Sequence, residues 1–216
     1  MPKPVASWIK NKLSILMLCS KQIRALGVLA ILSFGAFGTA LPAAAVEIDG
    51  LQLPDSFQIE DKVLRLNGYG TRHYSLLKIK VYSAALYTAK KINNSAALLE
   101  STDPQVVHLK MHRSASQADA IKAWEYYLDA NCINECTLPK AIKAEFLQAT
   151  AVMKAGDEET YIFSAAGLSL KRNSKLIANW QSSVLAKVVL ATWFGAVPTS
   201  EQLKIDLLNA KGWPAP

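Results

Sequence analysis

The sequence predicts an α+β fold in which helices pack on one face of an antiparallel sheet. Segments with alternating apolar and polar residues come early in the chain, and segments with a helical repeat of apolar residues follow them. A short pair of strands and further helices complete the order. Because strands and helices are grouped and do not alternate one by one, a doubly wound parallel sheet is disfavoured.

Three early segments alternate as strands do, namely residues 62–67, 77–82 and 105–113. The motif Gly68-Tyr69-Gly70 after the first segment predicts a bend or bulge, because glycine tolerates the backbone angles that such a feature requires. The alternation predicts two faces for the second segment. One face carries Leu77, Ile79 and Val81, and the opposite face carries Lys78, Lys80 and Tyr82.

Later segments repeat their apolar residues at helical spacing. Ser116 is suited to cap a helix whose apolar stripe is Ile121, Trp124 and Leu128. Pro139 opens a second helix, whose apolar side runs to Met153.

The last third of the chain predicts a hairpin and two more helices. Residues 156–159 form a turn before strands at about 160–164 and 168–172. A helix over 182–194 ends at Gly195, and a closing helix carries Leu203 and Leu207.

Residues 1–45 have the features of a secretory signal peptide. They carry five basic residues, no acidic residue and an apolar run at 25–37 that is too short and too glycine-rich for a stable span, which needs ~20 apolar residues. Small residues predict cleavage after Ala45, with Ala44 as the neighbouring option. An uncleaved membrane anchor is the alternative. Met17 opens a normal leader by itself and is the expected start, so we expect a periplasmic domain over residues 46–216.

Removal of the leader changes the charge of the protein. It takes away five of the 24 Lys and Arg residues and leaves 19 against 17 acidic residues, a net charge of +2. This composition gives no argument for nucleic acid or an anionic membrane as a partner. It also predicts no stable membrane span after cleavage.

Two cysteines remain in this domain, Cys132 and Cys136. An oxidising compartment and a polar loop favour a local disulfide. A zinc site is the alternative, and it would need two more ligands from only three histidines. A thioredoxin-like motif does not fit, because three residues separate the cysteines and that motif has two.

Common catalytic motifs are missing from the sequence, including Gly-x-Ser-x-Gly, a phosphate-binding glycine loop and His-Glu-x-x-His. His108 and His112 share a strand face with Lys110, which predicts a solvated sheet surface; a catalytic or metal role is the alternative. His73 is expected in a loop. We expect neither a metal nor a cofactor.

Arg72 and Tyr82 are the remaining candidates for chemistry. A guanidinium is permanently charged and can fork onto a carboxylate or enolate oxygen, and a phenol adds one hydrogen bond. The alternative is a surface arginine and an edge tyrosine.

Five segments in register resemble the bacterial chalcone isomerase-like proteins: LNGYGTR at 66–72, KVYSAALY at 80–87, LKMHR at 109–113, KAGD at 154–157 and TWFGAVP at 192–198. The resemblance covers nearly all of residues 46–216. It implies an open-faced β-sandwich in which a large antiparallel sheet and helices enclose a ligand cleft.

The resemblance also implies roles for particular residues. Arg72 matches the arginine that stabilises the attacking phenolate in the true isomerases, and Tyr82 stands where they have a threonine. Their active-site tyrosine and asparagine fall near Gln117 and Trp124, and Thr192 matches a late active-site threonine. Arginine paired with tyrosine is similar to the branch of the family that binds fatty acids, where this pair holds a carboxylate.

Three functions follow as hypotheses. The first is a non-catalytic protein that binds an apolar carboxylate, such as a fatty acid, through Arg72, Tyr82 and Thr192. The second is an isomerase or lyase acting on a phenolic or enone substrate through Arg72. The third is a structural or assembly protein of the cell envelope. For each we expect a monomer or a weak oligomer.

Overall fold

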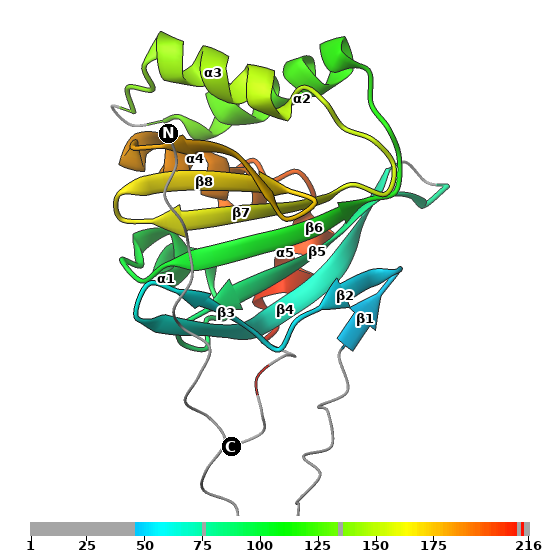
Figure 1. The fold of residues 1–216 in the computed structure, drawn as a ribbon, viewed down its shortest axis with the longest axis vertical. Helices are drawn as coiled ribbons and strands as arrows, with labels where there is room; N and C mark the ends of the chain where they lie inside the picture. Colours follow the sequence, from blue (N-terminus) through cyan, green and yellow to red (C-terminus); the bar gives the residue numbers. More distant parts are fainter. Residues whose placement is uncertain (1–45, 75–76, 134–135, 211–212, 214–216) are drawn as a thin grey trace, which may run out of the picture. The chain divides into compact units, whose positions relative to one another are not determined.

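The computed structural model describes residues 46–74, 77–133, 136–210 and 213, all of which belong to one compact unit of the chain (Figure 1). The predicted signal peptide, its cleavage after Ala45 or Ala44, and the start at Met17 lie outside the described residues. Both hydrophobic cores are built by residues from Ile48 onward.

The fold is α+β, as the sequence predicts. Seven antiparallel strands pair in the order in which they occur along the chain. They are β3 (Ser56–Ile59), β4 (Lys62–Tyr74), β5 (Ile79–Thr88), β6 (Gln105–Met111), β7 (Glu158–Ser164), β8 (Gly167–Arg172) and β9 (Lys175–Trp180). A separate hairpin of β1 (Val46–Ile48) and β2 (Leu51–Leu53) precedes them.

Helices cover one face of the seven-stranded sheet. The described helices are α1 (Ser95–Glu100), α2 (Gln117–Asn131), α3 (Lys140–Thr150), α4 (Ser183–Phe194) and α5 (Glu201–Leu208). Helix α4 lies against β7 and β8, and α5 lies behind β4 and β5 in Figure 1. Helix α2 packs on α4, and α3 packs on α2.

Most predicted boundaries agree with these elements. Ser116 and Ser182 cap α2 and α4 by accepting a hydrogen bond from a backbone N–H of the first turn, and α4 ends before Gly195. The helix that starts after Pro139 stops at Thr150, so Met153 lies beyond it and pairs with Ala115 in an isolated bridge.

The Gly68-Tyr69-Gly70 motif does not turn the chain. It lies inside β4, where a bulge at Asn67 shifts the pairing with β5. Neither Gly68 nor Gly70 has a positive φ, so these positions do not need glycine for its backbone freedom, contrary to the expectation from the sequence. A Cβ at Gly68 would stand 2.4 Å from the Leu207 carbonyl oxygen, and one at Gly70 would stand 2.7 Å from the Asp206 Cβ. The glycines are needed because α5 approaches the strand this closely.

The Asn67 side chain joins the bulge to the end of the chain. It is fully buried, and its Nδ2 donates to the carbonyl oxygens of Ile92 at 2.8 Å and Leu207 at 2.9 Å. Its Oδ1 accepts from the Ile92 N–H and from Trp213 Nε1, both at 3.0 Å. One amide thereby uses both donors and its acceptor to hold α5 against the sheet.

The opposite sheet face carries a second, smaller core under the β1–β2 hairpin. Leu51 and Leu53 of β2 pack on apolar side chains of β4, β5 and β6. At the hairpin tip, Asp49 accepts a hydrogen bond from Thr71 at 2.6 Å and forms an ion pair with Lys80. Lys110 Nζ donates to the Gly50 carbonyl oxygen at 2.7 Å. The first strands of the domain, which the alternation pattern did not predict, therefore cover part of the sheet.

We predict that Gly68→Ala destabilises the fold by about 2–3 kcal/mol, because the added methyl group meets backbone atoms of α5 that cannot move aside. Gly156→Ala is the matched control. It meets no atom within 4 Å but has a φ of +89°, so it should cost only about 1 kcal/mol of backbone strain. Urea unfolding measures both, and equal losses in the two variants would contradict the close-approach argument.

Acid should loosen the hairpin. Hydrogen bonds from Lys80 and then from Thr71 lower the pKa of Asp49 from its ordinary 3.8 to about 2. A carboxyl whose pKa falls on folding stabilises the folded state above the unfolded pKa, and this contribution is lost as the pH falls through the folded pKa. We therefore expect the stability difference between the wild type and Asp49→Asn to be constant above about pH 5. It should shrink between about pH 4 and 2, as measured by urea unfolding at each pH.

Candidate functional site

A cavity of about 690 Å³ lies on the helix side of the sheet, between the ends of β4–β6 and helix α2. This size is in the range of small-molecule sites, about 300–1,000 Å³. Its floor is mainly apolar and aromatic, with Tyr82, Leu109, Met111, Trp124 and Trp193. Its mouth is formed by more exposed residues, among them Tyr74, Arg113, Ser116 and Asp119.

The structure brings Arg72 and Tyr82 together in this cavity. They are direct cross-strand partners in β4 and β5, and both line the cavity. The bulge at Asn67 is responsible for the position of Arg72. Residues such as Leu64 and Leu66 face the second core before it, whereas Gly68, Gly70 and Arg72 face the helices after it.

Tyr82 faces the cavity for a related reason. Alternation predicted that it would share a face with Lys80 and lie opposite Ile79 and Val81. That prediction was wrong, because a register shift lies between the Arg72–Tyr82 and His73–Lys80 pairs. Ile79, Val81 and Tyr82 all line the cavity, whereas Lys80 pairs with Asp49 of the hairpin on the other face.

The Arg72 guanidinium is held without a carboxylate. Its Nε donates to the Thr199 carbonyl oxygen at 3.1 Å, and its Cζ lies 5.7 Å from the centre of the Tyr82 ring. None of the ion pairs between described residues involves Arg72. A partly buried cation of this kind attracts an anionic group in a ligand.

The Tyr82 hydroxyl is fixed by two neighbours. It accepts from Trp193 Nε1 at 3.0 Å and lies 2.9 Å from Thr199 Oγ1. Burial raises the pKa of Tyr82, and the Arg72 charge and these hydrogen bonds offset part of that rise. The side chain is therefore a neutral phenol, and when Thr199 donates to it, its own O–H is free to donate to a ligand.

Thr192 is not brought to the cavity. It is fully buried in α4, and its hydroxyl donates to the Val189 carbonyl oxygen at 2.8 Å. Its backbone carbonyl accepts from the Thr199 N–H at 2.8 Å and so holds the loop that supplies Thr199 to the site. Of the two positions matched to isomerase residues in the helix, Trp124 lines the cavity, whereas Gln117 is not among the lining residues.

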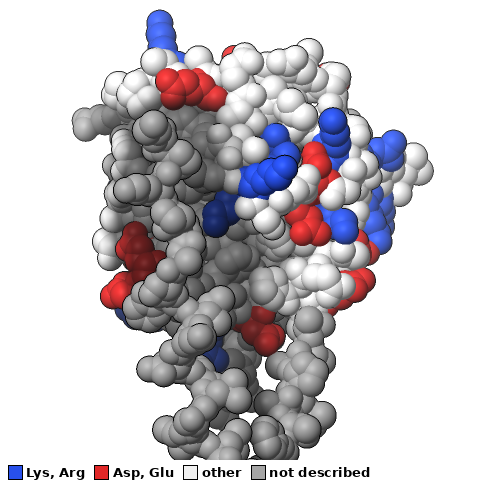
Figure 2. All heavy atoms as spheres, in the orientation of Figure 1, with Lys and Arg blue, Asp and Glu red and all other residues white. Residues whose placement is uncertain are grey.

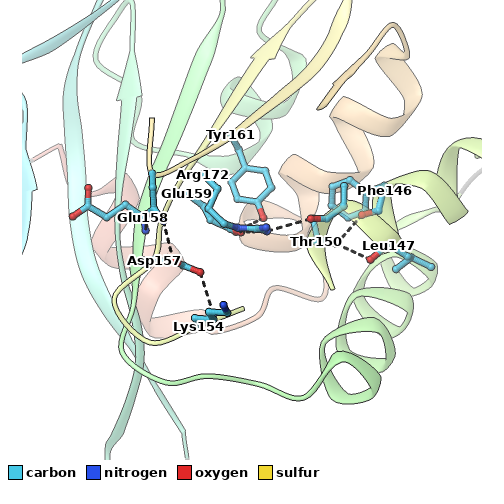
Figure 3. A network of polar contacts seen from close by, with 11 residues as sticks. Phe146, Leu147, Thr150, Lys154, Asp157, Glu158, Glu159, Tyr161 and Arg172 are labelled. Carbon is cyan, nitrogen blue, oxygen red and sulfur yellow. Dashed lines mark hydrogen bonds and ion pairs between the residues drawn. The ribbon is translucent and has the colours of Figure 1, made fainter. Parts of the chain in front are cut away.

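A buried ion pair that no sequence pattern indicated lies beside the cavity, which Glu159 and Tyr161 line (Figure 3). Glu159 Oε1 accepts from Arg172 Nε at 2.9 Å and Nη2 at 2.6 Å, and Glu159 Oε2 accepts from the Tyr161 hydroxyl at 2.7 Å. Burial, followed by the Glu159 charge, raises the pKa of Tyr161 well above its usual range. The sequence predicts a turn over residues 156–159, but β7 already begins at Glu158, and Glu159 continues the alternation of Tyr161 and Phe163 on its buried face.

Two histidines lie on the opposite face of the sheet. His108 is 8% exposed, packs near Phe57 of β3 and lies 3.0 Å from Thr160 Oγ1, so the predicted solvated surface is wrong for this residue. His112 Nε2 lies 2.8 Å from Ser83 Oγ. Burial lowers the pKa of both rings. His73 is exposed within β4 and does not lie in a loop.

Cys132 and Cys136 form the expected disulfide, which ties the end of α2 to the following segment. Within the described ranges, no three His, Cys, Asp or Glu side chains are grouped closely enough to hold a metal ion. In the same part of the chain, no helix has the length and apolar character needed to cross a bilayer.

The structure defines an α+β domain with a mainly apolar cavity that Arg72 and Tyr82 also line. The chain belongs to the chalcone isomerase-like family, because the family model of that description matches residues 45–209. The resemblance drawn from the sequence is thereby confirmed. A search of curated proteins gave no match.

The crystal structure of a fatty-acid binding protein from Arabidopsis thaliana has a similar fold. Its TM-score with this chain is 0.57 at 19% sequence identity, and the alignment covers 77% of this chain and 97% of that one. Likeness at this identity establishes the shared fold of a curled antiparallel sheet with helices on one face.

Replacement of the buried acid should be costly. Glu159→Gln leaves the Arg172 guanidinium buried without its charge partner, so we predict a loss of about 3 kcal/mol in the free energy of unfolding. Glu158→Gln is the matched control, because Glu158 is adjacent, more exposed and 3.6 Å from Lys110. It should change stability by less than about 0.5 kcal/mol. Chemical denaturation at pH 7 compares the two, and similar losses would contradict the assignment.

Proposed function

We propose that this chain is an exported, non-catalytic protein that binds an apolar carboxylate, such as a fatty acid, with the carboxylate on Arg72 and Tyr82. The observation that carries the proposal is the position of this pair. It lies side by side in a mainly apolar cavity, and Arg72 has no carboxylate partner among the described residues. Export rests on the features of residues 1–45, and a periplasmic location is part of the proposal.

The chemistry of the pair suits a carboxylate. The guanidinium nitrogens that do not contact Thr199 can donate to one or both ligand oxygens, and the Tyr82 hydroxyl can donate to the same group. The aromatic and aliphatic floor would hold the alkyl chain, whose burial supplies most of the binding free energy. The shared fold with the Arabidopsis fatty-acid binding protein supports this ligand class.

Features of the site argue against ring closure of a chalcone. Stabilisation of a developing oxyanion needs several preorganised donors. Thr192, which matches an active-site threonine of the isomerases, donates to the Val189 carbonyl oxygen and does not line the cavity. A base is also needed for most isomerase chemistry. Of the acids that line the cavity, Glu159 is paired with Arg172 and Asp119 accepts from the Ser116 hydroxyl at 2.6 Å.

We predict that Arg72→Ala weakens dodecanoate binding by about ten- to a hundredfold, because it removes a charge-assisted hydrogen bond. Tyr82→Phe should weaken it by about fivefold through loss of one neutral hydrogen bond. Titration calorimetry of the purified domain measures both, and mass spectrometry of gently purified protein should show a co-purified acid.

Arg65→Ala is the control for charge. Arg65 is exposed on the same strand and does not line the cavity, so its removal should leave affinity unchanged within about twofold. Equal affinities for the wild type and Arg72→Ala would refute the proposed site. Cyclisation of a chalcone above the buffer rate would refute the non-catalytic assignment.

A further inference from the structure

The most exposed large apolar side chains of the described residues lie at one end of β4 and β5. Leu77 is 81% exposed and Tyr74 is 65% exposed. Other exposed apolar side chains are less exposed and mostly lie on other elements, for example Tyr126 on α2, Leu176 and Ile177 on β9 and Ile205 on α5. An apolar pair in water at one place favours a contact surface over chance exposure.

This end of the sheet is also the mouth of the cavity. Tyr74 pairs with Ile79 across the two strands, and both residues line the cavity. Leu77 lies two residues before Ile79, on the connection between the strands. Any molecule that enters from this side passes the apolar pair before it reaches Arg72.

Positive charge surrounds the apolar pair. Lys78 follows Leu77 directly, and Arg113 lines the mouth from the end of β6. Neither forms an ion pair with another described residue. Asp119 at the start of α2 lines the same mouth and accepts a hydrogen bond from the Ser116 hydroxyl, so these described residues supply two cations against one anion. Figure 2 shows acidic and basic side chains intermingled on the face in view.

We propose that Tyr74, Leu77, Lys78 and Arg113 form a mouth surface that docks on an anionic phospholipid bilayer, and that the ligand passes there between bilayer and cavity. The proposal rests on the proposed binding of an apolar acid. The net charge of +2 over residues 46–216 gives no argument for an anionic membrane as a partner. The cations Lys78 and Arg113 beside the apolar pair do give one. Exposed apolar side chains flanked by cations suit the boundary between headgroups and acyl chains.

The advantage of this geometry concerns the alkyl chain. A fatty acid that leaves a bilayer through water exposes its whole chain to solvent, which is the main barrier to transfer. When the cavity mouth touches the bilayer, the chain can move from one apolar environment to the other without that exposure.

The test compares vesicle binding by residues 46–216, the part of the chain that contains both described cores. Vesicles of phosphatidylcholine with phosphatidylglycerol are compared with phosphatidylcholine alone in a co-sedimentation assay. The double variant Leu77→Ser/Lys78→Glu should bind the anionic vesicles about tenfold more weakly, because it loses one apolar anchor and reverses one charge. Salt should weaken the wild-type interaction.

The matched control is Leu176→Ser/Lys175→Glu, which makes the same two changes on β9, where Leu176 is 61% exposed. It should bind vesicles as the wild type does, within about twofold. Equal weakening in both double variants, or equal binding to both kinds of vesicle, would overturn the mouth surface and leave a protein partner as its occupant.

Dodecanoate binding measured in the absence of vesicles separates the docking inference from the proposed function. Neither Leu77 nor Lys78 lines the cavity, so the double variant should retain wild-type affinity for dodecanoate in the absence of vesicles. Its transfer of a fluorescent fatty acid from anionic vesicles should nevertheless slow by about tenfold. Unchanged transfer overturns the docking inference alone, whereas loss of dodecanoate binding by the wild type overturns the proposed function as well.

Discussion

The close approach of helix α5 to strand β4 is the constraint on which the rest of the structure depends. It is possible because Gly68 and Gly70 have no side chains, and it is held by the buried Asn67 amide, which bonds to the Leu207 carbonyl. The same residue marks the bulge that reverses the two faces of β4. Without that reversal, Arg72 would point toward the N-terminal hairpin. Helix packing and the position of Arg72 in the cavity therefore have one origin.

The two arginines on the helix side of the sheet illustrate different uses of the same charge. Arg172 is paired with Glu159 and Tyr161, so that its charge is balanced inside the domain. Arg72 has a backbone carbonyl and an aromatic face as partners, which orient it without neutralising it. Of the charged residues that line the cavity, Glu159 is therefore balanced by Arg172, whereas Arg72 has no carboxylate partner among the described residues.

Local patterns predicted the fold class, most elements of the helix face and the Cys132–Cys136 bridge, because these depend on neighbours in sequence. Arg72 and Tyr82 remained as candidates once the common catalytic motifs were found to be missing, and the resemblance to the chalcone isomerase-like family gave them expected roles. Strands β1–β3 and β9 and helix α1 were missed because they are short and only partly alternating. The burial of His108 depends on Phe57 from one of those strands.

The Glu159–Arg172 pair and the two register shifts between β4 and β5 arise from strand pairing, which no single segment encodes. Thr199 lies in the loop between α4 and α5, so no periodic pattern of strand or helix residues indicated that it contacts Arg72 and Tyr82.

The order of the strands has a consequence for how the chain folds. Each strand of the seven-stranded sheet pairs with its neighbour in sequence, so the sheet can grow as successive hairpins with little loop-closure entropy at each step. The bonds of Asn67 to Leu207 and Trp213 instead join residues 140 and 146 positions apart. They can form only when nearly the whole domain is available. The contacts of the sheet are thus local, which favours its early formation, whereas the packing of α5 on β4 depends on contacts that span nearly the whole domain.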